Sequence, residues 1–111
     1  MTTAYVNGIF TPLSEARISP MDRGFLFGDG VYEVIPCYGG QPVAMQYHLE
    51  RLHDSLEGIA LSPSHSDEQL NALIDELIRQ NGGGDLGIYL QITRGVVERR
   101  QHAFPEKCEP T

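Results

Sequence analysis

The sequence predicts an α+β fold with one domain over residues 1–111. The order of the elements predicts the class, and the length and composition predict the single domain. Strand-like segments precede two helix-like segments, and one further strand-like segment follows them, an order that differs from the regular alternation of a doubly wound sheet. The length of 111 residues suits one compact core, and the hydrophobic share of 41% is ordinary for a globular domain.

The first third of the chain has the two-residue period of strands. Residues 4–6 and 9–11 flank Asn7-Gly8, a pair that supplies the positive φ angles of a tight hairpin turn. Residues 31–38 form the next predicted strand, in which one face is expected to carry Val31, Glu33, Ile35 and Cys37.

Two features follow within and after this strand. Pro36 has no N–H to donate, so its position is predicted to lie at a sheet edge or a bulge. After Gly39-Gly40, residues 41–43 indicate a short return strand.

The middle of the chain changes to a helical period. In residues 45–59 an apolar side chain recurs every three or four positions, which predicts an amphipathic helix. Ser66 and Gln69 have the spacing of a capping box, so a second helix is predicted to start there. Glycines 82–84 end it. Residues 86–93 alternate again and form the last predicted strand, and the tail beyond them is polar and aperiodic.

Charge and composition exclude several classes of function. The net charge of −7 argues against binding to nucleic acid or to an anionic membrane, since both require a basic surface. No basic and apolar leader opens the chain and no apolar run could span a bilayer, so we expect a cytoplasmic protein. Cys37 and Cys108 are expected to be reduced thiols, and no metal site is predicted.

Four short motifs could carry chemistry. Each is weak by itself: glycines around Asp29 suit a turn, Arg51 suits a solvated helix position, and Arg100-Gln101-His102 suits a basic loop. The motifs are Asp22-Arg23-Gly24 with Phe27-Gly28-Asp29-Gly30-Val31-Tyr32-Glu33; His48-Leu49-Glu50-Arg51-Leu52; Thr93-Arg94-Gly95; and Arg100-Gln101-His102-Ala103-Phe104-Pro105.

In this order and spacing, the four motifs resemble those of the class IV (fold-type IV) pyridoxal-phosphate (PLP) aminotransferases. The last two resemble the D-amino-acid aminotransferase branch in particular, and the resemblance runs from Tyr5 to about Pro105. It implies the small N-terminal domain of those enzymes, an antiparallel-rich sheet with two helices packed on one side. It also implies a homodimer that transfers an amino group between a D-amino acid and a 2-oxo acid.

The resemblance assigns roles to individual residues. Tyr32 would bind the substrate α-carboxylate, and Arg51 would hold the phosphate of pyridoxal 5'-phosphate. Arg100 and His102 would reach across the two-fold axis to the carboxylate in the neighbouring subunit. One more residue than the family pattern separates Gly95 from this pair, so Arg99 remains an alternative to Arg100.

The resemblance also implies a Schiff-base lysine in the C-terminal half. The only lysine here is Lys107, which is expected to be a solvated surface residue, so no catalytic residue is assigned in this chain. We therefore expect the chain to be the N-terminal half of a longer two-domain enzyme. The 111 residues alone are expected to be inactive, to hold PLP weakly or not at all, and to self-associate through the apolar face of residues 86–92.

Two alternatives remain open. A fragment of an aminodeoxychorismate lyase would share the fold and the cofactor. A stand-alone, non-catalytic module would use Arg51 and the Arg100/His102 loop to bind an anion or a protein partner.

Overall fold

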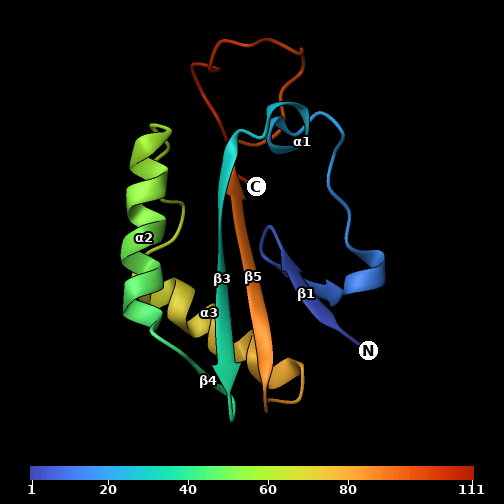
Figure 1. The fold of residues 1–111 in the computed structure, drawn as a ribbon. Coiled ribbons are helices and arrows are strands. Elements are labelled where there is room, and N and C mark those ends of the chain that lie inside the picture. Colours follow the sequence, from blue (N-terminus) through green and yellow to red (C-terminus); the bar gives the residue numbers. More distant parts are fainter.

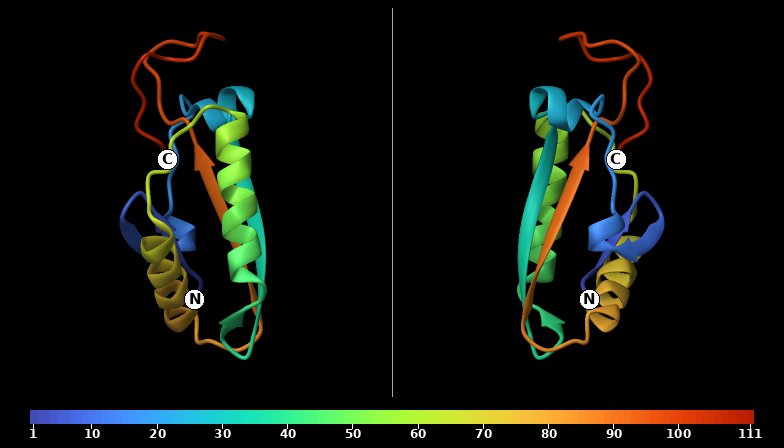
Figure 2. Two further views of the ribbon diagram at one scale, coloured as in Figure 1. Left: turned by 90° about the vertical axis from the view of Figure 1, so that its left-hand side faces the viewer. Right: turned by 90° about the vertical axis from the view of Figure 1, so that its right-hand side faces the viewer.

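The computed structural model describes all of residues 1–111 and has the predicted α+β class. Figure 1 shows a larger antiparallel sheet, whose strand order is β4-β3-β5, and a separate N-terminal hairpin. Figure 2 shows the hairpin next to α3 (Asp67–Gln80), where Thr3 forms hydrogen bonds with Asn81. The strands are β1 (Thr3–Val6), β2 (Ile9–Pro12), β3 (Gly30–Tyr38), β4 (Gln41–Pro42) and β5 (Leu86–Thr93).

Two long helices cover one face of the larger sheet, as expected (Figures 1 and 2). They are α2 (Met45–Gly58) and α3 (Asp67–Gln80), and the shorter elements are a 3-10 helix (Leu13–Glu15) and α1 (Arg23–Phe27). Leucines of α2 pack against Val31 and Ile92, and isoleucines of α3 pack against Ile35 and Ile88. The core therefore lies between the sheet and the two helices.

Local sequence signals determine several element boundaries. Asn7 and Gly8 have φ angles of 49° and 94°, which confirms the predicted hairpin turn. The capping box is also confirmed. The Ser66 hydroxyl accepts a hydrogen bond from the Gln69 backbone N–H at 3.1 Å, and the Gln69 side chain accepts one from the Ser66 N–H at 2.9 Å.

Pro36 lies in the middle strand of the sheet and not at its edge, yet its missing N–H costs no ladder bond. The Pro36 carbonyl accepts a hydrogen bond from Val43, so the backbone at this position faces the β4 side. β4 pairs only with Cys37 and Tyr38, which leaves the rest of that side of β3 without a strand. The long β3–β5 ladder is therefore intact, because Pro36 turns away from it.

The two faces of the larger sheet differ sharply in exposure. The predicted inner face of β3 is confirmed, since Val31, Glu33, Ile35 and Cys37 are all buried. The expectation that residues 86–92 would present an exposed apolar face is wrong, because α2 and α3 cover Ile88 and Ile92. The exposed apolar side chains of β3 and β5 lie on the opposite face of the sheet and are those of Tyr32, Val34, Tyr38 and Tyr89.

A buried cluster of charges joins α1, the start of β3 and the end of β5. The Asp29 carboxylate accepts hydrogen bonds from Arg23 Nε at 2.7 Å and from Arg94 Nε at 2.8 Å. The side chains of all three residues are at most 7% exposed. Arg94 also donates to the carbonyl of Ile59, which connects the cluster to the segment after α2. Asp29 therefore does more than occupy a turn between two glycines, because its carboxylate joins three segments of the chain.

We expect Asp29→Asn to destabilise the chain by about 3–5 kcal/mol, because the substitution leaves two buried guanidinium groups without their counter-charge. The free energy of unfolding in urea measures this loss. Asp54→Asn is the matched control, since Asp54 is exposed and forms no ion pair, and it should change stability by less than about 0.5 kcal/mol.

The effect of Asp29→Asn should depend on pH. Burial raises the pKa of Asp29, but hydrogen bonds from Arg94 and Arg23 and their charges outweigh burial, so the net pKa is lowered. A lowered pKa stabilises the fold above the unfolded value of about 3.9, and this contribution disappears as the pH falls through the folded value. The stability difference between wild type and Asp29→Asn should therefore be full at pH 7 and shrink below about pH 4. A difference that stays constant into acid would contradict this prediction.

Candidate active site

Arg51 is anchored on α2 by a buried glutamate of β3. Glu33 faces the helices, and its two carboxylate oxygens accept hydrogen bonds from Arg51 Nε at 2.9 Å and Arg51 Nη2 at 3.0 Å. His48 Nδ1 lies 2.7 Å from the same carboxylate, one helical turn before Arg51. Glu33 and His48 are buried, whereas the Arg51 side chain is 51% exposed. The buried acid thus holds an arginine whose other half faces solvent.

The electrostatics of this group keep both partners charged. Burial raises the pKa of Glu33, but hydrogen bonds from Arg51 and His48 outweigh burial and lower the pKa overall. The same contact raises the pKa of Arg51. Glu33 uses Nε and Nη2 and leaves the Nη1 corner of the guanidinium unoccupied by the acid, while the Tyr47 ring lies 5.5 Å from the guanidinium carbon. That corner can bind an external anion such as a phosphate.

Tyr32 lies on the face of β3 opposite Glu33, because successive side chains of a strand alternate. Its ring is 62% exposed and stacks on Tyr89 with the ring centroids 5.8 Å apart. The structure therefore does not bring Tyr32 and Arg51 onto one face. They flank β3 from its two sides.

The edge of β3 between these two side chains is open. β4 pairs only with Cys37 and Tyr38, so no strand pairs with the earlier residues of β3 on this side. α2 lies beside this part of β3 (Figure 1). The backbone of Pro36 faces that side, and antiparallel alternation turns the N–H and C=O groups of Tyr32 and Val34 the same way. A ligand at this edge could meet backbone donors, the Tyr32 side and the Arg51 side together.

Arg100 and His102 are brought together by Phe27 of α1. The Arg100 guanidinium carbon lies 4.7 Å from the centre of the Phe27 ring, and the His102 ring lies 5.1 Å from it. Both residues are exposed and belong to the loop after β5, which stands beside α1 and the start of β3 (Figure 1). A cation and an imidazole that share one aromatic platform suit a carboxylate ligand.

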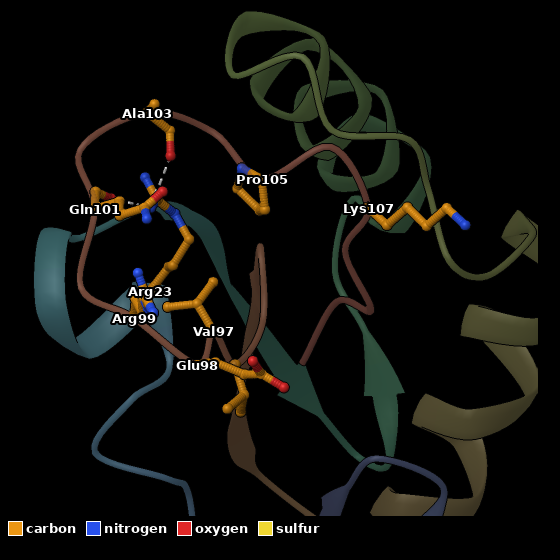
Figure 3. A pocket seen from close by; sticks show the side chains of 9 residues that line it. Arg23, Val97, Glu98, Arg99, Gln101, Ala103, Pro105 and Lys107 are labelled. Carbon is orange, nitrogen blue, oxygen red and sulfur yellow. Dashed lines mark hydrogen bonds between the residues drawn. The ribbon is translucent and has the colours of Figure 1, made fainter.

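Arg99 has a different environment. It lines a hollow of about 350 Å³ under the same loop, together with Glu98 and Lys107. In Figure 3 the Lys107 side chain points away from this hollow, and the residue is exposed, as expected of a surface lysine. No group of histidine, cysteine, aspartate and glutamate side chains could hold a metal ion. None of the helices combines the length and the apolar character that crossing a bilayer requires.

Sequence reasoning missed Glu33 and His48 as members of this site. A usable signal existed, since Glu33 alternates in register with Val31, Ile35 and Cys37, and an acid on a buried face requires a partner. The partners of Glu33 are His48 and Arg51 of α2, and the sequence pattern could not show which residues of the strand this helix would contact. The buried roles of Arg23 and Arg94 carried no local signal.

The comparisons with known proteins agree with this architecture. The family model described as "Amino-transferase class IV" matches residues 30–111. A D-alanine aminotransferase of Staphylococcus epidermidis is 40% identical over 105 residues, which cover 95% of this chain and 37% of that protein. A D-alanine aminotransferase of Listeria innocua is 40% identical over 101 residues, which cover 91% of this chain and 35% of that protein. The chain thus spans little more than a third of the length of these relatives.

Solved structures show the same arrangement of elements. The branched-chain amino acid aminotransferase of Escherichia coli matches with a TM-score of 0.84 and 27% identity over 94% of this chain and 35% of that one. A 4-amino-4-deoxychorismate lyase of Pseudomonas aeruginosa matches with a TM-score of 0.72 and 28% identity over 86% of this chain and 33% of that one. The family model and the similar proteins show that the chain belongs to the class IV aminotransferase family, and its motifs and fold agree.

Proposed function

We propose that this chain forms the N-terminal part of a PLP-dependent D-amino-acid aminotransferase, a homodimer that transfers an amino group between a D-amino acid and a 2-oxo acid. The observation that carries the proposal is the Arg100/His102 pair held over Phe27. The relatives at about 40% identity that are named D-alanine aminotransferases support the same activity. A cytoplasmic location is in keeping with Cys37 and Cys108, which are both free thiols.

Arg51 holds the cofactor phosphate in this proposal. A phosphate group favours a planar guanidinium over a single point charge, because two parallel N–H donors match two of its oxygens. The residues present fit the phosphate: Arg51 is half exposed, and Glu33 fixes its orientation through Nε and Nη2. When it is bound to a lysine amine, PLP supplies an electron sink for the substrate α-carbon.

Tyr32, Arg100 and His102 bind the substrate α-carboxylate. Arg100 contributes charge, while the Tyr32 hydroxyl and His102 complete the set of hydrogen-bond donors. Tyr32 belongs to the sheet, and the Arg100/His102 pair belongs to the loop above α1. We place the sheet residue and the loop pair in different subunits, so that each carboxylate site is completed across the two-fold axis.

The full-length protein that carries this chain should convert D-alanine and 2-oxoglutarate to pyruvate and D-glutamate. Coupled detection of pyruvate measures the reaction, and release of 4-aminobenzoate from aminodeoxychorismate measures the rival lyase activity. The 111 residues alone should give neither product, because Lys107 is their only lysine and it is exposed. Lyase turnover without transamination would reject the proposal, and ligand binding without either reaction would favour a non-catalytic module.

Arg100→Gln in the full-length protein should lower kcat/KM for D-alanine by about 10- to 100-fold, since a charge-assisted contact to a carboxylate contributes about 1.5–3 kcal/mol. Arg99→Gln is the matched control and should change kcat/KM less than about threefold, because Arg99 lines the hollow and not the Phe27 platform. The reverse ranking in steady-state kinetics would assign the carboxylate to Arg99.

Arg51→Gln should weaken PLP binding to the full-length protein by about 10- to 100-fold, because the charged phosphate contact is lost. Titration of the apo protein with PLP, followed by absorbance, measures the dissociation constant without any turnover. Arg79→Gln is the matched control, since Arg79 also pairs with a helix-side glutamate, Glu76, but lies on an exposed surface of α3. An unchanged dissociation constant in Arg51→Gln would remove Arg51 from the cofactor site.

A further inference from the structure

We infer that Arg23, buried beneath the loop that carries Arg100 and His102, is a positioning residue for the substrate carboxylate. The inference rests on the proposed function for the identity of the ligand. The contacts of Arg23 with the loop are independent of that function. Arg23 belongs to α1 and touches neither the proposed substrate nor the cofactor. Its action on the site is exerted through the backbone of the loop.

All three nitrogens of the Arg23 guanidinium are engaged. Nε donates to the Asp29 carboxylate at 2.7 Å, which fixes the plane of the group. Nη1 donates to the carbonyl of Gln101 at 2.6 Å and to that of Ala103 at 3.3 Å. Nη2 donates to the carbonyl of His102 at 3.2 Å. One buried cation therefore binds three consecutive carbonyls of the loop, two of which are visible as dashed contacts in Figure 3.

These contacts determine where the recognition side chains lie. Arg23 binds the carbonyl of His102 directly, and it binds the carbonyl of Gln101, which follows Arg100 in the chain. Because the bonds go to backbone atoms, they constrain the path of the loop and not the identity of its side chains. Phe27 then lies 4.7 Å from the Arg23 guanidinium carbon and also supports Arg100 and His102. The clamp and the platform come from the same short helix.

The base of the loop is fixed separately, so the clamp acts on its middle. Gly95 follows β5 with a φ of 98°, and a Cβ there would lie 2.0 Å from the carbonyl of Glu109. The backbone groups of Thr93 and Thr111 bond to each other. Between these anchors, the loop residues around Arg100 are exposed and have no regular secondary structure. Without Arg23, this part of the loop would keep only the stacking of Arg100 and His102 on Phe27 and of Phe104 on Arg94, and its backbone would lose three hydrogen bonds.

A lysine cannot replace this arrangement. An ammonium group could pair with Asp29, but it lacks the planar fork that reaches a carboxylate on one side and several carbonyls on the other. Arg23→Lys should therefore keep the buried charge and release the loop. A loosened loop must be ordered again when substrate binds, which lowers affinity for the carboxylate without changing the reacting atoms.

Native-state digestion with trypsin tests the clamp in the 111-residue chain. The bond after Arg100 lies in the clamped loop, whereas the bond after Arg51 lies in the middle of α2 and reports global unfolding. Arg23→Lys should raise the rate of cleavage after Arg100 about tenfold, equivalent to about 1.4 kcal/mol of local opening, and should leave cleavage after Arg51 unchanged. Equal increases at both bonds, or none at Arg100, would overturn the inference.

A matched control and a second measurement complete this test. Arg79→Lys is the matched control, because it makes the same substitution in an exposed ion pair, and cleavage after Arg100 should not change. If Arg23→Lys gives no folded protein by circular dichroism, hydrogen exchange of the arginine side chains in the wild type decides by NMR. Exchange of the Arg23 Nη hydrogens much slower than that of the exposed Arg79 supports the clamp, and equal exchange rates reject it.

Kinetics of the full-length protein test the link to substrate. Arg23→Lys should raise KM for D-alanine about tenfold, with kcat and the PLP dissociation constant within about twofold of wild type. Unchanged KM in a variant whose loop is cleaved faster would overturn the positioning role. If the wild-type protein shows no transamination, the proposed function fails, yet the tryptic rates still decide whether Arg23 clamps the loop.

Discussion

The buried carboxylate of Asp29 is the constraint on which the rest of the structure depends. Two guanidinium groups, those of Arg23 and Arg94, are withdrawn from water in a chain that offers them one shared acid. Burying either cation without that acid would cost several kcal/mol, so the three segments that carry these residues can fold only together. Residues 65 positions apart are thereby joined, and α1, the start of β3 and the end of β5 meet at one end of the sheet.

Glu33 repeats this chemistry on the helix side with a different result. There a buried acid again binds an arginine through two nitrogens, but Arg51 approaches from the solvent side of α2 and remains half exposed. Arg23 has every nitrogen engaged, and such a group serves the fold and the loop it holds. In Arg51, Glu33 leaves Nη1 unoccupied, and such a group can bind a ligand. The number of occupied donors therefore separates the two roles more clearly than the residue type does.

The sequence predicted what short-range chemistry decides. Turn residues, the Ser66 capping box and strand periodicity placed the hairpin, both long helices and β5 close to their observed bounds. The pattern did not show which face the helices cover, and the apolar face of residues 86–92 was therefore wrongly expected to be exposed. Ion pairs such as Glu33 with Arg51 join separate elements, and only the fold reveals them. The motif residues Tyr32 and Arg51 were identified from the sequence. The resemblance did not show that they lie on opposite sides of β3, which follows from the alternation of side chains along the strand.

The chain uses arginine almost to the exclusion of lysine, with seven arginines and the single Lys107. A pocket for a carbonyl-bearing cofactor and for 2-oxo acids needs cations that bind phosphate and carboxylate without attacking a carbonyl. A guanidinium group meets this need, because it stays protonated and presents a planar fork, whereas a desolvated amine becomes a nucleophile. The Glu33 carboxylate reinforces this choice, since its hydrogen bonds raise the pKa of Arg51. In the proposed enzyme, this portion of the chain therefore supplies binding and orientation, and the reactive amine belongs elsewhere.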